Sequence, residues 1–238
     1  MPVLWLVLII LGLAALGFIM GRQRALKSAG GDSRKLHSLP NYYGANVALS
    51  VLVPSFGVLI VWLLAQPMLI DRAVSAMIPP ELIPENTTTG LVMSDVRRVA
   101  EGLDVAVEKG AMSASEANSV RSEFTDLRAR LGDVGVALGQ DVRPEVLRAA
   151  QRYRTLNATG NMALTIVICL VAVAGFINAL RHCTAEYRAR NVVERAILVI
   201  LMAAASIAIL STIGIVLSML FESVNFFGLH RWTDFFFG

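Results

Sequence analysis

The chain has 238 residues and a formal net charge of +3, and 55% of its residues are hydrophobic while only 16% are charged. Soluble domains average about 45–50% apolar and about 25% charged residues, so this composition is typical of a bilayer-embedded chain and excludes an ordinary soluble enzyme. No basic stripe carries interleaved aromatic residues, so the positive charge does not indicate a nucleic-acid binder.

Four stretches lack Asp, Glu, Lys and Arg and are long enough to cross a bilayer: 3–20, 45–70, 155–180 and 196–221. About 20 apolar residues in a helix cross the hydrocarbon core, and a helix satisfies its own backbone there. A cleavable signal peptide is the alternative for the first, shortest stretch. The basic cluster of Arg22, Arg24 and Lys27 follows that stretch instead of preceding it, which favours an uncleaved helix with its N-terminus outside.

The connections between these stretches predict the orientation. Loop 21–44 carries five Lys or Arg against one Asp, and loop 181–195 carries four Arg against two Glu. Four spans place both loops on the same side, and the positive-inside rule assigns that side to the cytoplasm. Tyr42 and Tyr43 then fall at the inner interface and Trp62 and Trp232 at the outer one, as aromatic belts do.

The segment 71–157 is predicted to lie outside the membrane, on the periplasmic side. It carries 11 Lys or Arg and 13 Asp or Glu, the balance of a solvated domain, and it opens with three prolines that form a stiff connection. We expect one helix with an apolar stripe at positions 92, 96, 99, 103 and 106, spaced as in a helix-packing seam.

A second stripe runs through positions 117, 120, 124, 127, 131, 134 and 138. Ser113 and Glu116 form a capping box that starts this helix, and the short join at Gly110 predicts an antiparallel hairpin. A third helix is expected to begin at Pro144 and to run toward the third span. A hairpin of this size has little core of its own, so we expect it to pack on partner helices, a second copy or the membrane-proximal surface. The two stripes indicate either a self-contained scaffold or a docking surface.

No constellation of catalytic, cofactor-binding or metal-ligating residues emerges from the sequence. The spans contain no ionisable residue of the kind that marks a proton relay or ion site, and no phosphate-binding loop or hydrolase motif occurs. His182 beside Cys183 is too little for a metal site. Pro54 and Gly57 interrupt the second span, where they indicate a tolerated break or a kink beside a cavity, and Asn178 suggests a contact between helices.

The end of the chain carries a more specific pattern. An Asn191-Val-Val-Glu-Arg segment leads into a helix with the sequence IGIVLSMLFESVNFF at 213–227, and an aromatic turn, Asp234-Phe-Phe-Phe-Gly238, follows. Residues 191–238 resemble the first core helix of a phosphate ABC transporter permease of the PstC type. In that family this helix runs from the cytoplasm outward, the direction that the charged loops predict here.

The resemblance implies a membrane-embedded permease that is not itself an enzyme and holds no cofactor. Its implied partners are the lipid bilayer, a second permease subunit, an ABC ATPase subunit that hydrolyses ATP, and a periplasmic phosphate-binding protein. The family's permeases continue with further core helices, so the chain resembles the N-terminal part of a longer permease. A transmembrane sensor with a helical input domain is the main alternative, and a membrane assembly factor is another.

The sequence therefore predicts an all-α membrane protein with four transmembrane helices and an extracytoplasmic helical hairpin between the second and the third. We expect the parts to be two spans with a basic cytoplasmic loop (1–70), a periplasmic hairpin domain (71–157), a third span with a cytoplasmic loop (158–195), and the first core helix with the start of a periplasmic loop (196–238).

Overall fold

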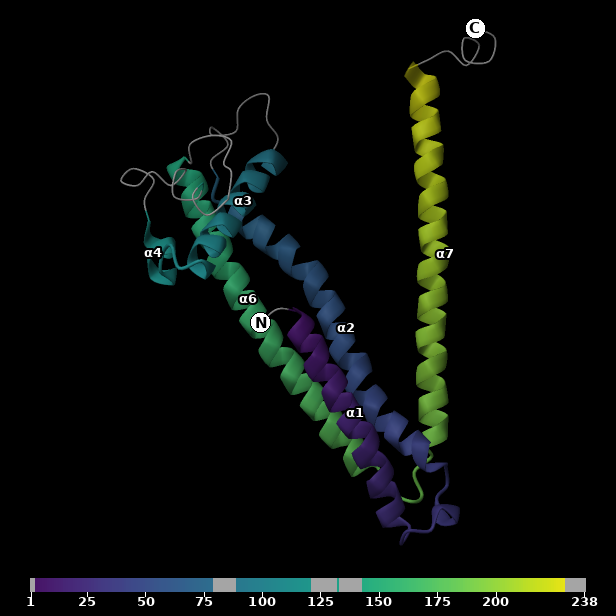
Figure 1. Cartoon of the computed structure of the whole chain (residues 1–238). Coiled ribbons are helices and arrows are strands. Elements are labelled where there is room, and N and C mark those ends of the chain that lie inside the picture. The colour runs from purple at the N-terminus through teal and green to yellow at the C-terminus, as the bar shows by residue number, and fades with distance from the viewer. Residues whose placement is uncertain (1–2, 79–88, 121–131, 133–142, 230–238) are drawn as a thin grey trace. The chain divides into compact units, whose positions relative to one another are not determined.

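The computed structural model describes residues 3–78, 89–120, 132 and 143–229 (Figure 1). Its elements are helices, and the described residues contain no strand. In chain order they are α1 (Val3–Ser28), a short 3-10 helix η1 (Ser33–Lys35), α2 (Pro40–Ser75), α3 (Thr89–Glu108), α4 (Ala114–Ser119), α6 (Pro144–Arg181) and α7 (Ala189–Leu229). The predicted all-helical class is confirmed for these residues.

Four of these helices, α1, α2, α6 and α7, are long and apolar enough to cross a membrane, as the charge-free stretches predict. They extend well beyond those stretches. The 36 residues of α2 and the 38 residues of α6 would measure about 54 Å and about 57 Å at 1.5 Å per residue, against a hydrocarbon core of about 30 Å. Both helices therefore supply polar turns outside the apolar segment.

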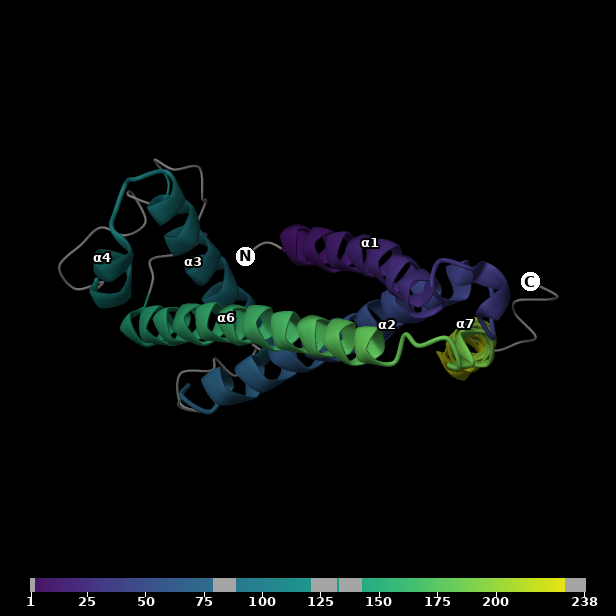
Figure 2. The same ribbon diagram turned by 90° about the horizontal axis from the view of Figure 1, so that it is seen from below.

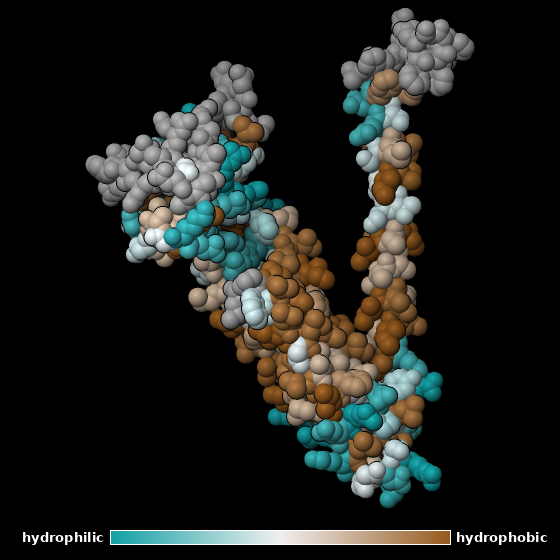
Figure 3. All heavy atoms as spheres, in the orientation of Figure 1, coloured by the Kyte–Doolittle hydropathy of each residue, from teal (hydrophilic) through white to brown (hydrophobic). Residues whose placement is uncertain are grey.

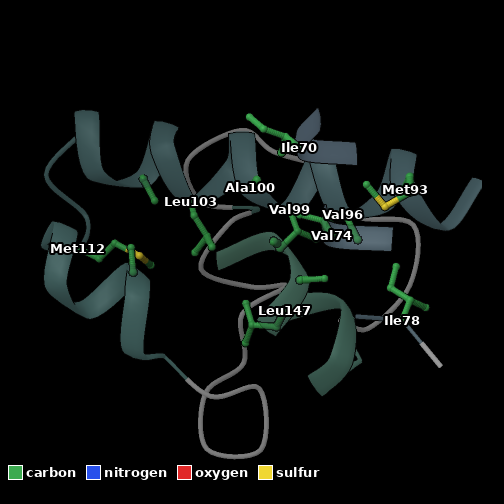
Figure 4. Close-up of a cluster of buried hydrophobic side chains, with 14 residues drawn as sticks. Ile70, Val74, Ile78, Met93, Val96, Val99, Ala100, Leu103, Met112 and Leu147 are labelled. Carbon is green, nitrogen blue, oxygen red and sulfur yellow. The ribbon is translucent and has the colours of Figure 1, made fainter. Parts of the chain in front are cut away.

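The chain divides into two compact units. The first unit, 1–13 with 51–175, contains what we call the α3–α4 domain: α3, α4, the end of α2 from Ile70 and the start of α6 up to Leu156. One hydrophobic cluster unites these elements, with Val74 from α2, Leu103 from α3 and Leu147 from α6 all at most 2% exposed. Figure 4 shows these side chains gathered between the helices, and α3 and α4 lie beside the start of α6 in both ribbon views (Figures 1 and 2).

The apolar stripe predicted for α3 is the face that packs. Val96, Val99, Leu103 and Ala106 are buried in the cluster, and Val92 is partly buried against it. The α3 stripe thus packs against the continuations of α2 and α6. This face is therefore not free to dock a partner, and the domain is not a self-contained scaffold. The sequence did not indicate that the span helices themselves would complete this core.

The start of α4 follows the predicted capping box: the Ser113 hydroxyl accepts a hydrogen bond from the Glu116 amide, and the Glu116 carboxylate accepts one from the Ser113 amide. The predicted start of α6 at Pro144 is likewise confirmed, and this helix runs without a break into the third span. The structure describes α4 only to Ser119, and the rest of the second stripe lies outside the described residues, as do the three prolines. The hairpin arrangement stays a prediction.

The second unit, 14–50 with 176–238, brings α1 and α2 close together at glycines. A Cβ atom added at Gly44 would lie 2.5 Å from the Phe18 carbonyl oxygen, and one added at Gly21 would lie 2.9 Å from the Tyr43 carbonyl oxygen. These distances are below van der Waals contact, so the two helix backbones approach as closely as small residues allow.

In α7, Ala189 and Val193 are buried, whereas every side chain from Ile197 to Gly228 is exposed. The exposed residues include large apolar ones such as Leu210 and Phe221. Apolar side chains that stay exposed over so long a helix are suited to lipid or to the surface of another membrane helix. Apolar surface also covers much of the other candidate spans in Figure 3.

Candidate functional site

Two loops that are far apart in the sequence meet at what we call the loop junction, formed by 29–39 after α1, the first turns of α2, and 182–190 before and at the start of α7. The His37 amide donates to the Ala185 carbonyl at 3.0 Å, and the Arg190 amide donates to the Ser38 hydroxyl at 3.3 Å. The Tyr43 hydroxyl lies 3.2 Å from the Ala185 carbonyl and 2.9 Å from that of Tyr187. These bonds fasten one loop to the other.

A small core closes the loop junction. Tyr43, Val47, Ala25 and Ala189 are completely buried there, together with Cys183, which is 1% exposed. Tyr43, which the sequence predicts at the inner interface, is completely buried, and its hydroxyl bonds two loop carbonyls. Burial also raises the pKa values of the Cys183 thiol and the Tyr187 hydroxyl, which favours the neutral form of each group.

A second polar site, the amide cluster, joins α2 to α6. The Gln66 side chain donates to the Asn157 and Asn161 side-chain oxygens at 2.8 Å and 3.2 Å, and its own oxygen accepts from the Trp62 indole at 2.6 Å. A Cβ atom added at Gly160 would lie 2.8 Å from the Gln66 nitrogen, so the glycine makes room for the amide. The cluster is suited to holding two helices in register.

The α3–α4 domain has charged and polar contacts at its edges. Arg97 of α3 pairs with Asp71 of α2 at 2.6 Å, and Arg154 of α6 pairs with Asp104 of α3. The Gln151 side chain donates to the carbonyls of Ala117 and Val120 at 3.1 Å and 2.9 Å. These contacts attach α3 and α4 to the span helices and do not converge on a common ligand position.

The residues that the sequence singled out are not brought together. Pro54 lies inside the continuous helix α2, and a Cβ atom at Gly57 would meet nothing within 4 Å. The Asn178 side chain is exposed, and its carbonyl oxygen lies 2.8 Å from a ring nitrogen of His182. Within the described ranges, no three His, Cys, Asp or Glu residues are grouped so that they could hold a metal ion.

Sequence reasoning missed both the loop junction and the amide cluster. A signal was present for the close approach of α1 and α2, since Gly17 and Gly21 have the G-x-x-x-G spacing of a packing face in membrane helices. The amides at 66, 157 and 161 stand at the ends of two charge-free stretches, where polar side chains commonly bind neighbouring helices. The junction had no such signal, because three of the four bonds described above end on backbone carbonyls.

Comparison with known families bears on this architecture. The family model described as "Phosphate ATP-binding cassette transporter" matches residues 7–177. The chain belongs to this phosphate transporter family. No curated protein and no solved structure matches the chain.

The family match covers most of α1, all of α2, the α3–α4 domain and most of α6. It thus includes the amide cluster and ends before the second loop of the junction. The residues on which the sequence resemblance rested, 191–238, lie beyond the match. The two findings agree on a phosphate ABC transporter while drawing on different parts of the chain.

Proposed function

We propose that the chain is part of the membrane-embedded permease of an ABC importer for inorganic phosphate in a bacterial inner membrane. The family match over 7–177 carries the proposal, because it names the transported ion and falls on helices that are apolar enough to span. The PstC-type pattern at 191–238 supports the permease role. A partner ATPase supplies the energy, a second permease subunit completes the path, and a periplasmic binding protein delivers phosphate.

In this proposal the loop junction faces the cytoplasm and segment 71–157 forms a periplasmic domain. The excess of Lys and Arg in loops 21–44 and 181–195 supports this orientation. The candidate spans contain no carboxylate or ammonium group in their apolar stretches, which fits transport driven by a partner ATPase and not by an ion gradient through these helices.

The domain's role in the proposal is structural. Its hydrophobic cluster contains the end of α2 and the start of α6, so it joins these two helices beyond their apolar segments. The amide cluster joins the same two helices a second time. Replacing 71–157 with a flexible linker should therefore lower the abundance of the permease more than its transport per molecule. Near-complete loss of uptake at unchanged abundance would assign the domain a direct part in transport.

Phosphate uptake tests the proposal directly. Cells lacking the gene should lose high-affinity uptake of radiolabelled phosphate, and the gene restored at its natural locus should recover it. The matched control restores a variant with Arg98→Gln, an exposed change on α3. Full uptake in the deletion strain, combined with altered expression of phosphate-responsive genes, would instead support the sensor.

Thiol labelling tests the orientation. Ser33, Arg190 and Ala114 are all exposed, so a cysteine at each position reports its side of the membrane and not its burial. In a background with Cys169 and Cys183 replaced by alanine, cysteines at 33 and 190 should be shielded from an impermeant reagent in intact cells, whereas one at 114 should react. Labelling at 190 without labelling at 114 would invert the topology.

A further inference from the structure

The two loops of the junction concentrate positive charge. Segments 21–44 and 181–195 together contain nine Lys or Arg against three Asp or Glu, a net charge of +6 in a chain whose total is +3. The remainder of the molecule is therefore net negative. The junction fastens the two loops together, and we call the Lys and Arg residues of the two segments together the basic face.

Few of these charges are neutralised locally. Arg190 pairs with Glu194 at 2.6 Å, and Asp32 uses its carboxylate to accept from the Arg34 amide. The exposed side chains of Arg22, Lys27 and Arg188 are among those with no ion pair in the part of the chain that the structure describes. The basic face thus has several uncompensated cations available to an anion.

The depth of these residues indicates what that anion is. Arg22, Arg24 and Lys27 lie in the last turns of α1, two to seven residues after the end of the apolar stretch 3–20. At 1.5 Å per residue this is about 3–11 Å beyond the hydrocarbon, and the headgroup layer begins at that boundary and is roughly 5–8 Å thick on each side. Arg181, the last residue of α6, directly follows the apolar stretch 155–180.

An apolar side chain accompanies the charges. Leu39 is 69% exposed and stands between Ser38 of the junction and the first turn of α2. An exposed leucine in this loop can contact the apolar part of a lipid at the headgroup level. A soluble phosphate ion would gain nothing from it.

We propose that the basic face is a binding site for the headgroup of an anionic phospholipid. Cations of α1, η1 and loop 182–188 contact the lipid phosphates, and Leu39 contacts the acyl region. The site is independent of the transported substrate, since it needs only membrane embedding. Juxtamembrane clusters of Lys and Arg attract anionic lipids through the same electrostatics.

Native mass spectrometry of the full chain in neutral detergent tests this site, with cardiolipin and phosphatidylcholine as the probes. Each basic residue near an anionic surface contributes about fivefold to binding. We expect wild-type protein to retain cardiolipin at least about tenfold better than phosphatidylcholine. Replacing Arg24, Lys27, Arg34 and Arg188 with Gln should abolish this preference, whereas R24K, R34K and R188K together should keep it.

The matched control replaces four exposed arginines of the first unit, Arg72, Arg98, Arg148 and Arg152, with Gln and should retain cardiolipin. Wild-type protein needs no variant to test the source of the anion: raised salt should weaken cardiolipin retention, while millimolar inorganic phosphate at constant ionic strength should leave it unchanged. Displacement by inorganic phosphate, or equal retention of both lipids by the wild type, would overturn the proposal. So would full retention by the four-Gln variant.

Discussion

The α3–α4 domain and the loop junction both lie outside the apolar stretches, but different physical interactions hold them. In the domain, side chains such as Leu103 and Leu147 fill the space between helices, so its stability depends on apolar volume. At the junction, Gly44 admits the Phe18 carbonyl and the Tyr43 hydroxyl bonds two loop carbonyls. Beside its small buried core, the junction depends on the missing side chain at Gly44 and on hydrogen bonds to the backbone.

The largest effect is expected from removing volume in the domain. Leu103→Ala empties a completely buried position in α3 and should destabilise the domain by about 2–5 kcal/mol. Hydrogen exchange of the α3 amides in the full chain measures this change. Leu91→Ala, on the same helix at a position that is 59% exposed, is the matched control and should change exchange by less than about 0.5 kcal/mol. Equal exchange in both variants would show that the cluster does not stabilise α3.

The next effect comes from adding volume at the junction. Gly44→Ala places a methyl group 2.5 Å from the Phe18 carbonyl oxygen, which forces α1 and α2 apart and should cost about 1–3 kcal/mol. Gly57→Ala is the control on the same helix, because its added methyl group meets nothing within 4 Å. Thermal unfolding in detergent should show a lower midpoint for the first variant only. Equal midpoints would mean that the helices do not approach so closely.

Removing one hydroxyl should have a smaller effect. Tyr43→Phe removes the hydroxyl that donates to the Ala185 and Tyr187 carbonyls. These carbonyls keep the His37 and Ala189 amides as donors, so the cost should be about 1 kcal/mol. The buried Cys183 reports the result, because an opened junction exposes its thiol and reverses the burial that raises its pKa. In a Cys169→Ala background, Cys183 alkylation should accelerate about fivefold or more.

Tyr42→Phe is the control for that measurement, since the Tyr42 side chain makes no hydrogen bond among the described contacts and lies partly exposed. Its alkylation rate should equal that of the parent. If both tyrosine variants accelerate the reaction alike, the rings rather than the Tyr43 hydroxyl hold the junction closed.

This contrast explains what the sequence could predict. The four candidate spans, the α3 stripe, the capping box at Ser113 and the helix start at Pro144 all follow from local rules of charge, period and capping. The lengths of α2 and α6 do not follow from these rules. A stretch without charge shows which part of a helix can lie in lipid, but it does not show where the helix ends. Ile70 and Val74 therefore enter the domain's core without a signal in the span pattern.

The junction was harder to predict for a different reason. Ala185 and Tyr187 contribute carbonyls that any residue possesses, and their partner lies more than 140 positions away. The amide cluster is intermediate: Gln66, Asn157 and Asn161 are visible as polar residues at span ends, but their pairing depends on the register of two helices. The sequence can therefore indicate contacts that side chains make, such as those of the amides, but not contacts that end on backbone carbonyls.

The smallest effect is expected at the exposed ion pairs, one in each region. The side chains of Arg97 and Asp71 are 46% and 32% exposed, and their ion pair joins α3 to α2 across 26 positions of the sequence. Solvent screens such a pair, so Arg97→Gln should cost less than about 1 kcal/mol. The effect should still be measurable by hydrogen exchange of α3, because the second Asp71 oxygen is buried without a hydrogen-bond partner in the described part of the chain, and the loss of Arg97 removes the cation that compensates this carboxylate.

Arg190→Gln provides the comparison in the loop junction. Its pair with Glu194 is more exposed, at 63% and 50%, and lies within one helix at the i,i+4 spacing, so its removal should leave thermal unfolding of the junction unchanged. Raised salt should also remove the change in α3 hydrogen exchange that Arg97→Gln causes, since salt screens exposed charges more than buried ones. A large loss for Arg97→Gln that persists in high salt would show that the pair is effectively buried. The α3–α4 domain would then depend on charge as well as on apolar volume.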